Sequence, residues 1–124
     1  VTSRYYGISE SLLTRYASYQ GSDPSRAWPV GTLKPNDYGL FDMLGNALEW
    51  TQDPLKKYPD PMRQTLGPTV DSFDELPLSD KNQRVLRGGS FLNREPFIRS
   101  ANRSYDLPTF QGESYGFRVA RTYP

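Results

Sequence analysis

Three short blocks, in a fixed order and separated by long irregular segments, constrain this chain more than any other feature of its sequence. They are residues 39–50 (GLFDMLGNALEW), 84–91 (RVLRGGSF) and 116–121 (GFRVAR). Each block combines glycine with apolar and charged residues, and none is long enough for a large helix or strand. The chain is therefore expected to fold around a few short elements joined by ordered loops.

The second and third blocks are typical of short strands. Residues 84–87 form an apolar-centred run, and the following Gly88-Gly89 pair permits a bulge or a sharp change of direction. In residues 116–121, Phe117 and Val119 alternate with polar or small neighbours, as in a half-buried strand.

One helix is expected, over residues 9–16. Ser9 can cap it, and Leu12, Leu13 and Tyr16 share one face. Residues 21–35 and 53–80 contain closely spaced Gly, Pro, Ser and Asp and are predicted to be loops. One helix, a few strands and much loop indicate the α+β class.

Composition limits both the core and the partners. The chain has 124 residues, of which 35% are hydrophobic and 14% aromatic, so we expect one domain or part of one, with a small aromatic-rich core. A net charge of +1 argues against nucleic acid or an anionic membrane surface as a partner. The sequence has no apolar run of about 20 residues, so we expect a soluble chain that does not cross a membrane.

The sequence contains neither cysteine nor histidine. Disulfides, thiolate nucleophiles, Cys- or His-ligated metals and Ser-His-Asp catalysis are therefore excluded for these 124 residues. The absence of cysteine is compatible with the cytoplasm, but the sequence leaves the localisation open.

Two carboxylates flank a Gly45-Asn46 turn in the first block. Asp42 and Glu49, together with main-chain carbonyls exposed by the turn, would form a hard all-oxygen site suited to Ca²⁺. An alternative reading is structural: Asp42 caps the turn and Glu49 pairs with an arginine.

Arginines and tyrosines gather in the last third of the chain. Forked guanidinium groups beside aromatic rings are suited to grip a carboxylate, a phosphate or a peptide backbone. The candidate ligand-binding residues are Arg87, Asn93, Arg94, Arg99, Arg103, Tyr105 and Tyr115, and the wider set of arginines includes Arg84, Arg118 and Arg121. The alternative is that these arginines only hold loops to the core. Three nearby acidic residues are expected to be solvated loop charges: Glu95, Asp106 and Glu113.

The three ordered blocks resemble the carboxy-terminal half of the formylglycine-generating, sulfatase-modifying-factor superfamily, whose fold is C-type-lectin-like. The resemblance implies an α+β fold that is loop-rich, with short antiparallel strands. It also implies that residues 1–124 form the carboxy-terminal half of one domain. The expected partner is then the amino-terminal remainder of that domain, or a companion chain.

The resemblance further implies a calcium site. Its ligands would be the Asp42 side chain, the main-chain oxygens of Gly45 and Ala47, and the Glu49 carboxylate. A second family calcium site would fall in residues 17–30, where the sequence does not reproduce its pattern.

Catalytic members of the superfamily have two copper-binding cysteines after the double glycine. Here Asn93 falls about where the first would lie, and the second would fall near Ile98 or has no counterpart in a shorter loop. Copper-dependent oxidation of a substrate cysteine is therefore not expected. The leading prediction is a non-catalytic, calcium-stabilised, C-type-lectin-like binding module with a protein or peptide ligand. One alternative is a metal-dependent oxidase or sulfur-transfer enzyme whose active-site ligands lie upstream. Another is a hypervariable ligand-binding protein of a diversity-generating retroelement.

Overall fold

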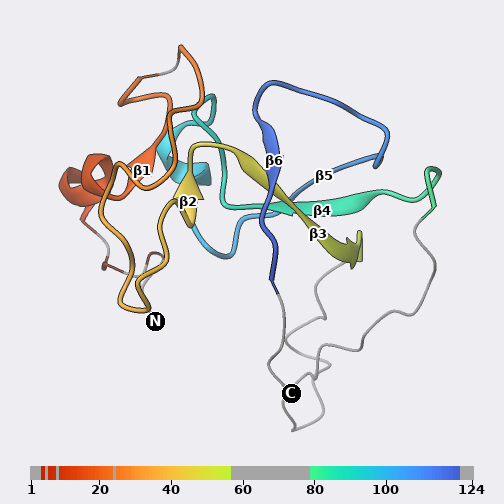
Figure 1. The fold of residues 1–124 in the computed structure, drawn as a ribbon, viewed down its shortest axis with the longest axis horizontal. Coiled ribbons are helices and arrows are strands. Elements are labelled where there is room, and N and C mark those ends of the chain that lie inside the picture. The colour runs from red at the N-terminus through yellow and green to blue at the C-terminus, as the bar shows by residue number, and fades with distance from the viewer. Residues whose placement is uncertain (1–3, 5, 8, 24, 57–78, 121–124) are drawn as a thin grey trace, which may run out of the picture.

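The computed structural model describes residues 4, 6–7, 9–23, 25–56 and 79–120. Two 3₁₀ helices and six strands are named in this part of the chain (Figure 1). In chain order they are η1 (Glu10–Arg15), β1 (Ala17–Ser18), β2 (Leu44–Gly45), β3 (Leu48–Pro54), β4 (Arg84–Arg87), η3 (Glu95–Phe97), β5 (Ser104–Asp106) and β6 (Tyr115–Phe117). Among these residues no helix is long and hydrophobic enough to cross a bilayer.

Two small sheets organise these elements. The larger has the strand order β5-β4-β3-β6, with β4 antiparallel to both β3 and β5 and with β6 parallel to β3. The smaller is the parallel pair β1-β2, which lies beside η1 on the left of Figure 1. The expected antiparallel strands are thus accompanied by two parallel pairings, β1 with β2 and β3 with β6. Each of these pairs joins segments that are distant in sequence.

The core is small and has two parts. Leu13 of η1, Ala17 of β1, Leu44 of β2 and Ile98 after η3 form one buried cluster. The second part is fully buried and centres on β4 and the turn after it, with Val85, Leu86 and Phe91. Aromatic rings extend the first part, since Tyr6 stacks on Tyr16 at 4.5 Å between ring centroids.

The expected helix at residues 9–16 is present as the 3₁₀ helix η1, and the expected Ser9 cap is wrong. The Ser9 hydroxyl pairs with the Ser11 hydroxyl at 2.8 Å and makes no capping bond to the backbone. Only Leu13 of this helix is buried. A tight helix suits a short connector that leads directly into β1, because 3₁₀ geometry is favoured in pieces of a few residues.

Strand β3 extends further than the sequence predicts. It continues through Asp53 and Pro54, which the sequence assigns to a loop. Pro54 is tolerated because it ends the strand, where the pairing register with β4 shifts. The rest of the predicted loop falls largely in residues 57–78, outside the described residues. The described part of residues 21–35 has no helix or strand, as expected.

The half-buried alternation predicted for residues 116–121 is wrong. Phe117 and Val119 are 78% and 83% exposed, although Phe117 belongs to β6 as expected. The reason is position: β6 is a three-residue strand at the edge of the sheet, and among the described strands it pairs only with β3.

Three glycines have the positive φ that the turns of this fold require, and two of them, Gly45 and Gly89, also lie close to neighbouring atoms. Gly88 and Gly89 both have positive φ, 89° and 78°, which confirms the predicted change of direction after β4. Gly45 has φ 76° and lies against the backbone of Ser18, where β2 pairs with β1.

We predict that Gly45→Ala strongly destabilises the protein, because the new Cβ would overlap the Ser18 carbonyl oxygen. Gly39→Ala is a matched control, since Gly39 has the same φ of 76° but open space around its Cα. The control should cost the left-handed penalty of about 1–2 kcal/mol, and Gly45→Ala at least about 2 kcal/mol more. Urea unfolding measures both, and equal losses would contradict the proposed close approach.

Candidate functional site

The turn between β2 and β3 is held from three sides by Asn46. Its amide oxygen accepts from the Trp28 N–H at 2.8 Å, and its amide nitrogen donates to the Trp28 carbonyl at 3.1 Å. Its main-chain N–H donates to Ser18 at 2.8 Å, and its carbonyl accepts from Phe91 at 2.9 Å. Asn46 has φ 64°, which Asn tolerates better than most residues. Four bonds from one residue thus join β1, the Trp28 loop and the turn after β4.

Asp42 is buried and also has positive φ, at 55°. Its Oδ2 accepts from the Gly31 N–H at 2.7 Å, so the carboxylate fixes the loop that runs beside it.

Glu49 of β3 pairs with Arg118, which follows β6. Arg118 Nε lies 2.9 and 3.1 Å from the two Glu49 oxygens, and its Nη2 lies 2.6 Å from Oε1. The same Nη2 donates to the main-chain oxygens of Phe41 and Asp42 at 3.0 and 3.3 Å. The hydrogen bonds to Glu49 raise the pKa of Arg118 above its ordinary value. One guanidinium therefore links β3, the end of β6 and the loop before β2.

The four expected calcium ligands are close in sequence, and their oxygen chemistry suits Ca²⁺. Asp42 Oδ2 and both Glu49 oxygens nevertheless already accept N–H groups. No cluster of three or more His, Cys, Asp or Glu side chains occurs in the described part of the chain. Gly45 and Ala47 would therefore have to supply main-chain oxygens, and Glu49 would have to exchange Arg118 for the ion. The structural alternative raised by the sequence was that Glu49 pairs with an arginine. This pair is present, and the arginine is Arg118.

Asn93 has a structural role in its turn. Its Oδ1 accepts from the Ser90 N–H at 2.8 Å and from the Ser90 hydroxyl at 3.1 Å, and its carbonyl accepts from Gln20 at 3.0 Å. Arg87, at the end of β4, makes long contacts of 3.4 and 3.5 Å to the carbonyls of Ser100 and Asn102.

The remaining candidate ligand residues differ in exposure. Arg94 and Arg99 are exposed, and their side chains make no hydrogen bond or ion pair with described residues, whereas Arg103 is half-buried. Tyr105 of β5 is 52% exposed. Tyr115 of β6 is half-buried and packs edge-on to Trp50 at 5.8 Å between centroids.

Two acidic residues interpreted as solvated loop charges have specific partners, so that interpretation is wrong for them. Glu95 pairs with the buried Arg4, which also donates to the Glu95 and Ile98 carbonyls. Asp106 accepts from the Tyr115 hydroxyl at 3.1 Å. Burial, and secondarily this bond, raise the pKa of Tyr115. No local spacing signalled the Glu95 pairing, because Arg4 lies 91 positions away in the sequence.

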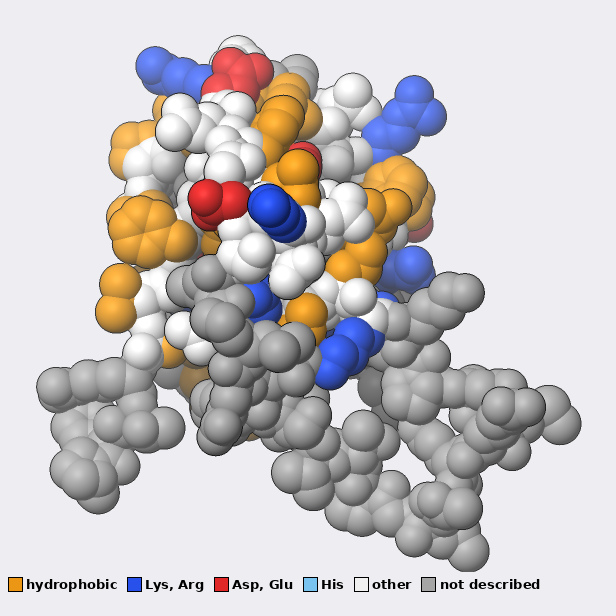
Figure 2. All heavy atoms as spheres, turned by 90° about the vertical axis from the view of Figure 1, so that its right-hand side faces the viewer, with side chains coloured by type: hydrophobic (Ala, Val, Ile, Leu, Met, Phe, Trp, Pro, Cys, Tyr) orange, Lys and Arg blue, Asp and Glu red, His pale blue; other side chains and the backbone are white. Residues whose placement is uncertain are grey.

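An open cleft of about 510 Å³ lies beside the Glu49–Arg118 pair. Exposed apolar side chains line it, including Leu40, Phe41, Phe117 and Val119. In the coloured part of Figure 2, hydrophobic side chains lie in several separate groups among polar and charged ones. Large contiguous apolar patches on a protein surface are typical of interaction sites.

These features define a loop-rich α+β domain of the C-type-lectin-like, formylglycine-generating-enzyme type, which confirms the predicted fold class. The chain belongs to the family described as sulfatase-modifying factor enzyme 1-like domain, whose model matches residues 5–123. The resemblance noted in the sequence is thereby confirmed.

Proteins similar to this chain include a kinase, a formylglycine-generating enzyme and a variable protein, by their names. The chain is 30% identical over 123 residues to the serine/threonine-protein kinase pkn1 of Chlamydia caviae, an alignment covering 98% of this chain and 18% of that protein. It is 35% identical over 95 residues to the formylglycine-generating enzyme of Bos taurus, covering 74% of this chain and 23% of that protein. Among solved structures, Treponema denticola variable protein 1 matches with a TM-score of 0.66 and 28% identity, over 88% of this chain and 37% of that one. The chain therefore spans about a fifth of the two curated relatives and under two fifths of the solved structure.

We predict that Arg118→Met lowers the free energy of unfolding by about 1 kcal/mol, because the partly exposed pair with Glu49 and two carbonyl contacts are lost. Arg94→Met is the matched control and should change stability by less than about 0.5 kcal/mol. Denaturant titration compares the two. Similar effects from both variants would show that the Arg118 contacts contribute nothing specific.

Proposed function

We propose that this chain is part of a non-catalytic, C-type-lectin-like binding module with a calcium-stabilised scaffold. One observation carries the non-catalytic part of this proposal. Asn93, which falls about where the first catalytic cysteine of the superfamily would lie, caps its turn through Ser90. The second cysteine would fall near Ile98, which is fully buried in the core, or has no counterpart in a shorter loop. Neither residue offers a thiolate to a metal or substrate.

The proposed ligand surface is the exposed part of the arginine and tyrosine set. Arg94 and Arg99 present unpaired guanidinium groups among the described residues, and Tyr105 exposes an aromatic ring. Arginine and tyrosine are enriched where proteins bind one another, because they combine large contact area with directional hydrogen bonds. This combination supports a protein or peptide ligand.

The calcium part of the proposal rests on the donor chemistry at Asp42, Gly45, Ala47 and Glu49. A bound calcium ion would supply a positive charge that links Asp42, in the loop before β2, to Glu49 of β3, and Arg118 now links these two segments. Asp42 and Gly45 have positive φ angles, so the backbone at these two residues is left-handed and not extended as in a regular strand. We infer that calcium and Arg118 compete for Glu49.

The partner that completes the module is proposed to be the amino-terminal remainder of the same domain, or a companion chain. The cleft beside Glu49 and Arg118 supports this, since Phe117 and Val119 leave most of their surface exposed. The partial coverage of every relative described above agrees with a domain that is longer than residues 1–124.

A second candidate function is a hypervariable ligand-binding protein. The structural similarity to Treponema denticola variable protein 1 favours it, because the match covers 88% of this chain. Sequence variation among strains that is confined to the exposed residues of the last third would support this function over an invariant binding module.

We predict that calcium raises the thermal midpoint of chelator-treated protein and that Asp42→Asn removes most of this shift. Asn keeps the shape and tolerates the positive φ of Asp42 but lacks the charge. Asp80→Asn, at an exposed turn, is the control for the same chemical change. Titration calorimetry that detects no calcium binding, together with an unchanged midpoint, would refute the calcium site.

We also predict that the protein does not convert a sulfatase-type cysteine to formylglycine by the copper-dithiolate route. The test is mass spectrometry of a cysteine-containing sulfatase peptide incubated with the protein, copper, oxygen and reductant. The expected product yield equals that of a control without protein. Turnover well above this control would favour the enzyme alternative, with ligands supplied from elsewhere in the protein.

A further inference from the structure

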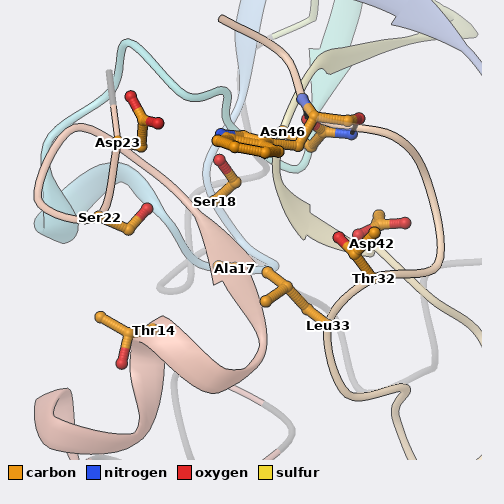
Figure 3. Close-up of a pocket in the computed structure, with 10 residues that line it drawn as sticks. Thr14, Ala17, Ser18, Ser22, Asp23, Thr32, Leu33, Asp42 and Asn46 are labelled. Carbon is orange, nitrogen blue, oxygen red and sulfur yellow. Dashed lines mark hydrogen bonds between the residues drawn. The ribbon is translucent and has the colours of Figure 1, made fainter. Parts of the chain in front are cut away.

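A second cavity of about 250 Å³ lies between β1 and the loops around Trp28 and Leu33, and Asp42 lines both this cavity and the cleft beside Arg118. Its walls combine apolar and acidic groups. Ala17, Leu33 and Trp28 provide the apolar part, and Asp23 and Asp42 provide two carboxylates. Figure 3 shows these two carboxylates on opposite sides of the pocket, with Ser18 and Leu33 between them. No lysine or arginine lines it among the residues that the structure describes.

Ser18 is the observation that points to a ligand. Ser18 lines the cavity and is only 6% exposed. Its Oγ has no hydrogen-bond partner among the described residues. A buried hydroxyl without a partner is unfavourable because it has lost its bonds to water, so a ligand that bonds to it removes this penalty. Asn46 also lines the cavity and is buried, but its amide oxygen and its amide nitrogen both already bond to Trp28.

The carboxylates of Asp23 and Asp42 give the cavity a negative charge, which favours a cation as the ligand. Asp42 uses Oδ2 for Gly31, and no described residue bonds to its Oδ1. Hydrogen bonds from Ser25, with smaller contributions that include Arg26, hold the pKa of Asp23 below its ordinary value. Asp23 therefore stays charged throughout the neutral range.

Trp28 shows that this region accommodates a cation beside an aromatic ring. The guanidinium carbon of Arg26 lies 4.9 Å from the Trp28 ring centroid, within the usual range for a cation–π contact. Arg26 itself is exposed and does not line the cavity.

We propose that this cavity binds a small organic ammonium ion with a compact hydrocarbon body. The ammonium group donates to the Ser18 hydroxyl and is stabilised by the Asp23 and Asp42 carboxylates, while the hydrocarbon body packs on Ala17, Leu33 and Trp28. The size is adequate, since an apolar cavity of about 150 Å³ holds benzene. This site is separate from the exposed arginine and tyrosine surface and does not depend on the function proposed for it.

The experiment uses three probes of the same shape and different charge: cyclohexylammonium, cyclohexanol and cyclohexanecarboxylate. Each is titrated into the full protein in chelator, with the Trp28 indole N–H followed by NMR in a Trp50→Phe background. We expect cyclohexylammonium to bind saturably and at least about tenfold more tightly than the alcohol, with no binding of the carboxylate. Equal affinity for the ammonium and the alcohol, or no saturable shift with any probe, would overturn the proposal.

Variants separate this site from the calcium site. Asp23→Asn, which leaves all four proposed calcium ligands intact, and Asp42→Asn should each weaken cyclohexylammonium by about fivefold or more. Asp80→Asn should not change the affinity. Ser18→Ala should weaken the probe while leaving the free protein as stable as before, or more stable, because an unsatisfied hydroxyl is removed. Unchanged probe affinity in Asp23→Asn and Ser18→Ala would refute the site even if calcium binds normally.

Discussion

The Asn46 side chain and backbone form the junction on which the two small sheets depend. The chain has 35% hydrophobic residues and a small core, so hydrogen bonds add to apolar burial in holding β1, the Trp28 loop and the turn after β4 together. Four hydrogen bonds from one residue supply these links, and Gly45 beside it allows β1 and β2 to approach closely. The geometry of Asp42 and Glu49 follows from this junction, because both residues flank the same turn. The junction therefore sets both the scaffold and the candidate site.

Positive charge at this turn can come from the chain itself. Arg118 neutralises Glu49 and binds two carbonyls of the preceding loop, so β6 is tied to the turn by a side chain as well as by its strand pairing with β3. A divalent ion placed among the same oxygens would serve a similar purpose. The two cations would differ in one respect: the arginine is part of the chain, whereas the occupancy of an ion would depend on the ion's concentration.

The features predictable from the sequence were those encoded by neighbouring residues. Gly88-Gly89, the strand at residues 84–87 and the loop at residues 21–35 follow from turn chemistry and local pattern. The nature of η1, the exposure of Phe117 and the partners of Glu95 and Asp106 depend on how separate segments pack. The sequence raised Glu49 pairing as an alternative, but only the fold identifies Arg118 as the partner. The cavity lined by Ser18, Asp23 and Asp42 gave no signal in the sequence, since these residues come to line one pocket only when β1 and the loops on either side of it are placed.

The parallel pairing of β6 with β3 has a consequence for the order of events during synthesis. β3 is an interior strand of its sheet, yet one of its two neighbours, β6, is the last of the described strands in chain order. The arginine that pairs with Glu49 of β3 also comes late, 69 positions further along the chain. When the ribosome has made β3 and β4, the unpaired edge of β3 is still a template for other strands. Cooperative closure of the larger sheet must therefore follow translation of residue 118, which makes this a slow-folding topology for its size.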